Sequence, residues 1–172
     1  LSARSIRIEA PIPGKAVVGI EIPNHEPEAI RFKPLLTPVS ESGAWTPNLA
    51  IPFALGKDVG GAPQVRDLAS MPHLLIAGAT GSGKSVMVNA IITSFLFART
   101  PQELRMILVD PKRVELSGYN GLPHLLVPVI TESDKAASAL KWAVLEMENR
   151  YRMFASAGAR NLEGYNSSRE DV

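Results

Sequence analysis

The hydrophobic pattern of the chain separates a short β-rich start from a longer part in which strands and helices alternate. Arg4 to Glu9 alternates polar and apolar residues and predicts a half-buried strand, and Ala16 to Ile22 predicts a second. Ala29 to Phe32 is a candidate third strand. More than half of the 14 prolines precede residue 56, so we expect an irregular connection from Lys33 to Pro52.

Beyond residue 52 the pattern predicts an α/β layered domain. Phe53–Gly56 and Gln64–Leu68 flank paired glycines and predict a hairpin. The expected elements after it are a buried parallel strand at His73–Ala77, a buried helix at Lys84–Ala98, a capped turn at Thr100–Glu103, strands at Met106–Val109 and Leu125–Ile130, and a long helix capped by Ser133 or Asp134 and ending at Gly158. In that last helix, apolar side chains recur at three- and four-residue steps at Leu140, Val144, Met147, Tyr151 and Phe154.

Composition excludes several classes of protein. With 45% hydrophobic and 20% charged residues among 172, wholesale disorder is excluded. The formal net charge of +1 is too balanced for a chain that only coats nucleic-acid phosphates, so any such role is local or shared. The absence of cysteine excludes disulfides and thiolate zinc sites and favours the cytoplasm. No apolar run approaches the about 20 residues of a membrane-spanning helix.

The strongest chemical signal is a phosphate-binding loop between the strand at His73–Ala77 and the helix that follows. Residues 78–85 fit the pattern G-x-x-x-x-G-K-[ST], whose glycines let backbone N–H groups converge on an anion at the start of a helix. The alternative without a phosphate-binding role is a glycine-rich turn between strand and helix with a solvated lysine. The residues expected to surround the phosphates of ATP are Gly78, Ala79, Thr80, Gly81, Ser82, Gly83, Lys84, Ser85 and Val86.

Within that loop, two side chains have expected catalytic roles. The Lys84 ammonium can reach the β and γ phosphates, and the Ser85 hydroxyl can ligate Mg²⁺. Hydrolysis also uses a strand-end carboxylate. Asp110 is the local candidate for this Mg²⁺ ligand, but Pro111 and Lys112 follow it instead of a second acid, which favours a position near the nucleotide or at a subunit contact. We therefore expect the catalytic carboxylate to be absent from these residues and turnover to be weak or nil.

Other side chains favour structural roles. His73 and His124 share a Pro-His-Leu-Leu context that suggests packing more than a metal pair, and His25 adds no ligand spacing. Lys112 and Arg113 follow an expected strand end, where open α/β sheets bind ligands. The favoured alternative is that both are ordinary solvent-exposed charges. Candidate arginine fingers, each with an ordinary surface role as the alternative, are Arg150, Arg152 and Arg160. Aromatic residues expected to pack, and not to stack on bases, are Trp142, Tyr151 and Phe154.

Longer blocks around the loop resemble one family of proteins. These blocks are Leu55–Asp58, Asp67–Gly78, Asp110–Leu116 (Asp-Pro-Lys-Arg-Val-Glu-Leu), Pro123–Leu126, Glu146–Tyr151 and Arg160–Asn166. In this order they resemble the FtsK/SpoIIIE family of DNA translocases, and the resemblance runs from about Arg4 to Asn166. The residues from Ser167 to Val172 match no block of the family.

The resemblance implies a P-loop RecA-like α/β domain with a truncated parallel sheet, preceded by a small β-containing module. Residues 1–50 resemble that module and residues 51–172 the first part of the motor domain. The chain starts with Leu1 and not with methionine, and we expect it to be a piece of a longer protein. The family's acidic-pair strand, later sensor positions and DNA-reading winged helix would follow Asn166.

In the family, such motors assemble as hexameric rings around double-stranded DNA and use ATP and Mg²⁺. A membrane-anchored parent in the bacterial inner membrane places them at the division septum for chromosome movement. By this resemblance, the residues present here would be cytoplasmic and would not touch the membrane. Three alternatives stay open: a protein-export or conjugation ATPase, a non-catalytic nucleotide-binding or oligomerisation module, and, as the weakest, a small phosphotransferase.

Overall fold

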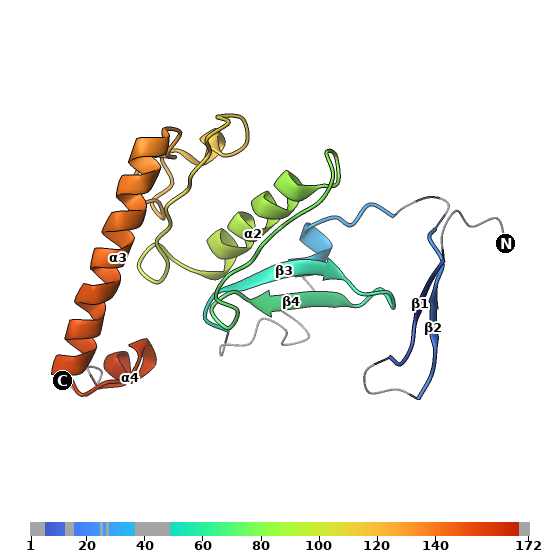
Figure 1. Cartoon of the computed structure of the whole chain (residues 1–172), viewed down its shortest axis with the longest axis horizontal. Helices are drawn as coiled ribbons and strands as arrows, with labels where there is room; N and C mark the ends of the chain where they lie inside the picture. Colours follow the sequence, from blue (N-terminus) through green and yellow to red (C-terminus); the bar gives the residue numbers. More distant parts are fainter. Residues whose placement is uncertain (1–5, 13–15, 25, 27, 37–48, 169–172) are drawn as a thin grey trace.

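The computed structural model describes residues 6–12, 16–24, 26, 28–36 and 49–168. Figure 1 shows two small hairpins, a helix against the second of them, and a long helix at the C-terminal end. The elements are β1 (Arg7–Glu9), β2 (Gly19–Glu21), β3 (Pro52–Lys57), β4 (Pro63–Asp67), α2 (Lys84–Ala98), the 3₁₀ turn η1 (Ser117–Tyr119), α3 (Ser133–Ser156) and α4 (Leu162–Ser167). The α/β class expected from the pattern is confirmed.

The N-terminal hairpin is a two-stranded antiparallel ribbon of β1 and β2, which lies apart from the rest of the chain (Figure 1). Both strands are shorter than expected, and Ile8 and Ile20, which face each other across the pair, stay exposed because none of the described segments covers them. The candidate strand at Ala29–Phe32 is wrong: those residues are irregular and residues 33–36 are helical. Most of the expected irregular connection lies outside the described residues.

The second hairpin, β3 with β4, confirms the expectation for this segment. Its turn is closed by Asp58, whose Oδ1 accepts hydrogen bonds from the amides of Gly60 and Ala62, both at 2.9 Å. The register shifts between Ala54 and Gly56, and Gly56 has a φ of 142° that other residues rarely adopt. Asp67 at the end of β4 ties the strand to residues 50 and 51 through their amides.

Helix α2 has the bounds that the sequence predicts, and it packs on β3 to form the core. Its apolar residues surround the helix, but only one face is buried, while Val86 and Phe97 are exposed. The expectation of a fully buried helix is therefore wrong for these residues. The buried hydrophobic cluster consists of Phe53, Ile91, Ile92, Phe95, Met106, Leu116, Leu125 and Val129.

The segments expected as strands at Met106–Val109 and Leu125–Ile130 run parallel, as expected, but they meet only at isolated bridges and form no regular strand. Two isolated bridges join them, Met106 to Leu125 and Val109 to Ile130. The second segment has two residues more than the first between these bridges and includes Pro128, which has no N–H to donate. A continuous ladder is therefore interrupted, although amides of Met106 and Asp110 still donate to carbonyls of the second segment at 2.8 and 2.7 Å.

The buried strand expected at His73–Ala77 is wrong in the described structure. These residues form no strand, and Leu75 is 90% exposed. Only Ile76 packs partly against the core. The apolar composition correctly indicates a segment suited to burial, but a strand needs a hydrogen-bonded neighbour, and none of the described segments is paired with it.

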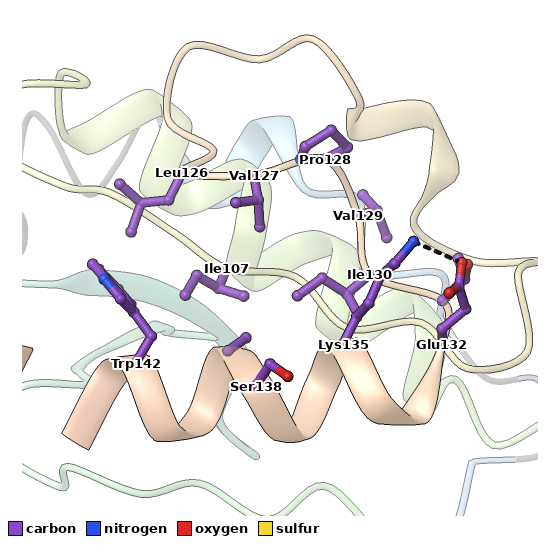
Figure 2. A pocket seen from close by; sticks show the side chains of 12 residues that line it. Ile107, Leu126, Val127, Pro128, Val129, Ile130, Glu132, Lys135, Ser138 and Trp142 are labelled. Atoms are coloured by element: carbon purple, nitrogen blue, oxygen red, sulfur yellow. Dashed lines mark hydrogen bonds and ion pairs between the residues drawn. The ribbon is translucent and has the colours of Figure 1, made fainter. Parts of the chain in front are cut away.

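Helix α3 lies across the parallel segments without burying any of its own side chains. Figure 2 shows a mainly apolar pocket between them, of about 650 Å³, with the Lys135–Glu132 ion pair at its edge and Trp142 among its lining residues. The expected Ser133 or Asp134 cap is wrong, because the N-cap is Glu132 and makes no side-chain capping bond. The predicted end is confirmed: Gly158 follows the last turn at a φ of 67°.

Within the described residues, none of the helices combines the length and the apolar composition needed to cross a bilayer.

Candidate phosphate-binding site

The loop from Gly78 to Lys84 folds through backbone conformations that glycine supplies. Gly81 has a φ of 80° and Gly83, the N-cap of α2, has a φ of 94°. A Cβ at either position would meet no atom within 4 Å, so both face open space. At Gly78 the constraint is different, because a Cβ would lie 2.4 Å from Ser82 Oγ. The three glycines therefore allow a backbone loop that is open at Gly81 and Gly83 and tight at Gly78.

The N-terminus of α2 has neither a side-chain cap nor an acidic residue to offset the positive end of the helix dipole. Gly83 makes no side-chain capping bond and the first turn contains no acidic residue. The first amides of any α-helix lack intrahelical acceptors, so the amides of Lys84, Ser85 and Val86 are available to an anion. An open loop of positive-φ glycines ahead of an uncapped helix fits a polyphosphate, which is the group that the motif implies.

Lys84 folds back over this loop. Its Nζ donates to the carbonyl oxygens of Gly78 and Ala79, each at 2.7 Å. An ammonium group has three N–H donors, and no further acceptor for the third lies among the described residues. The lysine is thus held over the loop by two bonds while one donor stays available, and its role toward a phosphate stays a prediction.

Ser85 is held by a carboxylate that lies outside the G-x-x-x-x-G-K-[ST] motif. The Ser85 hydroxyl donates to Oε1 of Glu115 at 2.6 Å, across 30 positions of sequence. Glu115 lies five residues beyond Asp110, on the loop that follows the parallel segment at residues 106–110. The acidic residue in the block Asp110–Leu116 is the signal that could have pointed to it.

Asp110 is buried, with 5% of its surface exposed. Its carboxylate accepts hydrogen bonds from the amides of Leu116, Glu115 and Arg113, at 3.0, 3.0 and 3.1 Å. The amides of Leu116 and Glu115 are the main cause that lowers its pKa below the ordinary value for aspartate, and they outweigh the opposing effect of burial. The Ser85 hydroxyl is bonded to Glu115 and not to Asp110, whose assignment as a magnesium ligand stays a prediction.

The remaining candidates lie outside this cluster of bonds. Lys112 and Arg113 are exposed on the loop after Asp110, and Arg113 has a φ of 59°. His73 is exposed, whereas His124 is buried and its Nε2 lies 2.9 Å from the carbonyl oxygen of Arg99. Across residues 6–168, where described, no three metal-ligating side chains gather in one place.

Of the candidate arginines and aromatic residues near the C-terminal end, Arg150, Arg152 and Phe154 contact partners in α3 or α4. Arg150 pairs with Glu146 at 2.9 Å, and Arg160 is exposed. Arg152 Nε donates to a backbone carbonyl one turn earlier. Phe154 packs on Tyr165 with ring centroids 5.4 Å apart, which agrees with a packing role. Trp142 lines the pocket beside α3 and Tyr151 is exposed.

One solved structure resembles this fold over nearly its whole length. It is described as the pCW3 conjugation coupling protein TcpA in its monomer form with ATPγS. The similarity has a TM-score of 0.57 at 26% sequence identity, and it covers 94% of this chain and 42% of that one. This similarity supports the α/β class of the chain. The similar protein was solved with a nucleotide analogue bound.

Sequence comparison gives closer relatives, each named DNA translocase FtsK. The protein of Rickettsia typhi is 56% identical over 167 residues, which are 96% of this chain and 22% of that protein. The protein of Pseudomonas aeruginosa is 52% identical over 173 residues, which are 100% of this chain and 21% of that protein. That of Clostridium acetobutylicum is 54% identical over 166 residues, 96% of this chain and 21% of its own length.

This chain therefore spans about a fifth of the length of the relatives that it matches. Family models agree with the relatives: residues 1–24 match the FtsK alpha domain, and residues 35–172 match the FtsK/SpoIIIE family. A match over most of the chain, together with identities above 50%, leads to one conclusion. The chain belongs to the FtsK/SpoIIIE family.

Proposed function

We propose that this chain supplies the ATP-binding loop of a motor that translocates double-stranded DNA. The observation that carries the proposal is the arrangement at residues 78–85, in which an open glycine loop, an uncapped helix end and a folded lysine meet. These are the groups that a nucleoside triphosphate requires. Membership of the FtsK/SpoIIIE family supports ATP-driven translocation as the use to which that binding is put.

In this proposal the residues of the loop have distinct roles. Backbone amides of residues 78–83, apart from that of Ser82, which donates to the carbonyl oxygen of Ala79, and those of Lys84 to Val86 hold the phosphate oxygens. The remaining ammonium donor of Lys84 contacts the terminal phosphates, and the Ser85 hydroxyl is a ligand for Mg²⁺. The ion, when bound, supplies neutralisation of the phosphate charge and fixes the phosphates in one orientation.

We further propose that the chain works in a ring of identical subunits, a hexamer, that encloses the DNA. The net charge of +1 supports contacts shared around a ring more than a basic surface on one subunit. Residues 1–50 would form the small module and residues 51–172 the start of the motor domain. The intact protein would be anchored in the bacterial inner membrane at the division septum, with these residues on the cytoplasmic side.

A conjugation ATPase is the second candidate, because the similar solved structure is that of a conjugation coupling protein. Its 26% identity is about half of the 52–56% shared with proteins named DNA translocase FtsK. Identity over the same residues therefore favours the chromosome translocase.

Lys84→Ala tests the binding site directly. Loss of a charge-assisted contact of about 1.5–3 kcal/mol should weaken ATP binding by about 10- to 100-fold, measured by titration calorimetry with Mg²⁺ present. Lys141→Ala, which removes an exposed lysine on α3, is the matched control and should bind as the unmodified chain does. Equal affinities for Lys84→Ala and the unmodified chain would contradict the proposed function.

A further inference from the structure

The short bond between Ser85 and Glu115 joins the phosphate loop to a segment that the motif does not include. At 2.6 Å from oxygen to oxygen, it lies in the range of strong hydrogen bonds from a hydroxyl to a carboxylate. The serine is the donor, because an ionised carboxylate can only accept. The hydroxyl hydrogen of Ser85 is therefore directed at Glu115, and both lone pairs of its oxygen point elsewhere.

The position of Glu115 is set by the loop that follows Asp110. One oxygen of the buried Asp110 carboxylate accepts the amides of Glu115 and of the next residue, Leu116. Leu116 is itself a member of the buried hydrophobic cluster. The backbone at Glu115 is thus held by Asp110 and by the burial of Leu116. The Glu115 side chain itself is exposed and bonds to Ser85 on α2.

A second bond fastens the same loop one helical turn further along α2. The Tyr119 hydroxyl donates to Oδ1 of Asn89 at 2.6 Å, and Asn89 in turn donates to the carbonyl oxygen of Ser85 at 2.8 Å. Holding the loop on the helix therefore does not depend on Glu115 alone. A carboxylate at position 115 has a more specific consequence, because it is the group that orients the Ser85 hydroxyl.

We propose that Glu115 is a positioning residue for the Mg²⁺ of bound nucleotide and acts through the hydroxyl of Ser85. The inference rests on the proposed function. A hydroxyl that gives its hydrogen to a carboxylate presents its lone pairs to a cation and becomes a better ligand, as other metal ligands do when an outer carboxylate accepts their hydrogen. Outer partners of this kind typically change metal affinity by about 10- to 100-fold.

A structural and a positioning role predict different results. If Glu115 only fastens the loop, its loss would weaken nucleotide binding equally with and without the ion. If it orients Ser85 toward Mg²⁺, its loss would reduce only the additional affinity that the ion provides. The difference between the two conditions therefore isolates the positioning role from general damage to the loop.

The experiment measures dissociation constants for ATPγS by titration calorimetry, once with excess Mg²⁺ and once with EDTA. Glu115→Gln keeps the size and an acceptor oxygen but removes the charge, and Glu115→Ala removes both. We expect the Mg²⁺-dependent gain in affinity to fall by about tenfold in the first variant and by up to about 100-fold in the second. The dissociation constants in EDTA should not change. Tyr119→Phe, the control, cuts the second fastening and should leave both constants as they are.

Three results would overturn the inference. The first is an unchanged Mg²⁺-dependent gain in both Glu115 variants. The second is an equal loss in Mg²⁺ and in EDTA, which would assign Glu115 to the loop's structure. The third is a selective loss in Tyr119→Phe as large as that in Glu115→Gln. An unmodified chain that binds ATPγS in neither condition would overturn the proposed function itself, and this inference with it.

Discussion

Single carboxylates organise the backbone around the phosphate loop. Asp110 accepts three amides from the loop that follows it, and so this carboxylate fixes the position of the Glu115 backbone. Charge and hydrogen bonding act together here, because amides that point at a carboxylate stabilise its ionised form. The lowered pKa of Asp110 is the measurable trace of this arrangement, and its causes are first the amides of Leu116 and Glu115.

Asp110→Asn should therefore change how stability depends on pH. A carboxyl whose pKa is lower when folded stabilises the fold above its unfolded pKa of about 3.9, and this contribution is lost as pH falls toward the folded value. The unmodified chain should be more stable than the variant at neutral pH, and the difference in melting temperature should shrink below about pH 4. Thermal melts across this range test it. A difference that is constant at every pH would contradict the assignment.

At the scale of elements, α2 and β3 are joined by one polar contact inside the hydrophobic core. Ser94 is fully buried, and its hydroxyl accepts the amide of Ala54 at 3.1 Å while donating to the carbonyl of Ala90 at 2.7 Å. Ala54 lies beside the register shift in β3, where the ladder to β4 is irregular. The serine thus satisfies an amide at the point where strand pairing is disturbed, next to Phe53 in the sequence of β3, which belongs to the core.

Ser94→Ala should destabilise the fold by about 1–3 kcal/mol, because it leaves a buried amide without an acceptor. Ser138→Ala is the matched control: Ser138 makes the same bond to a carbonyl four residues earlier, but it is exposed on α3. Its effect should stay within about 0.5 kcal/mol. Urea unfolding of both variants measures the difference, and equal free energies of unfolding would show that the Ala54 contact contributes nothing.

Across the whole molecule, packing is unevenly distributed. The core gathers α2, β3 and the parallel segments, whereas α3 buries no side chain and leaves a pocket of about 650 Å³ beside the parallel pair (Figure 2). Helices draw most of their stability from tertiary packing, so a long helix with little burial opens locally at low free-energy cost. The N-terminal hairpin, with exposed Ile8 and Ile20, has the same weakness.

Hydrogen exchange should reveal this difference. We expect amides in the middle of α3 to exchange at least about tenfold faster than those of α2 around Ile92, which corresponds to an opening free energy lower by about 1.4 kcal/mol. Exchange followed by mass spectrometry on peptides from the two helices measures the ratio. Equal protection in both helices would mean that α3 opens only when the whole fold unfolds.

Features that depend on neighbouring residues were predictable from the amino-acid order. The bounds of α2, the hairpin of β3 and β4, the turn at Thr100–Glu103 and the end of α3 before Gly158 follow from turn residues, caps and periodicity within a few positions. The backbone form of the loop at residues 78–83 belongs to the same class, since the positive φ angles of Gly81 and Gly83 arise within a few consecutive residues. Local chemistry determines such elements because their hydrogen bonds close over short distances.

Features that join segments distant in the sequence could be identified only from the tertiary structure. The bond from Ser85 to Glu115 spans 30 positions, and no periodicity marks it. The hydrogen bonds from loop amides to Asp110 depend on which segments come to lie side by side, and so does the lack of a paired neighbour for His73–Ala77 among the described segments. Apolar composition can indicate that a strand is suited to burial, but only its neighbours can supply the hydrogen bonds and the cover that make it one.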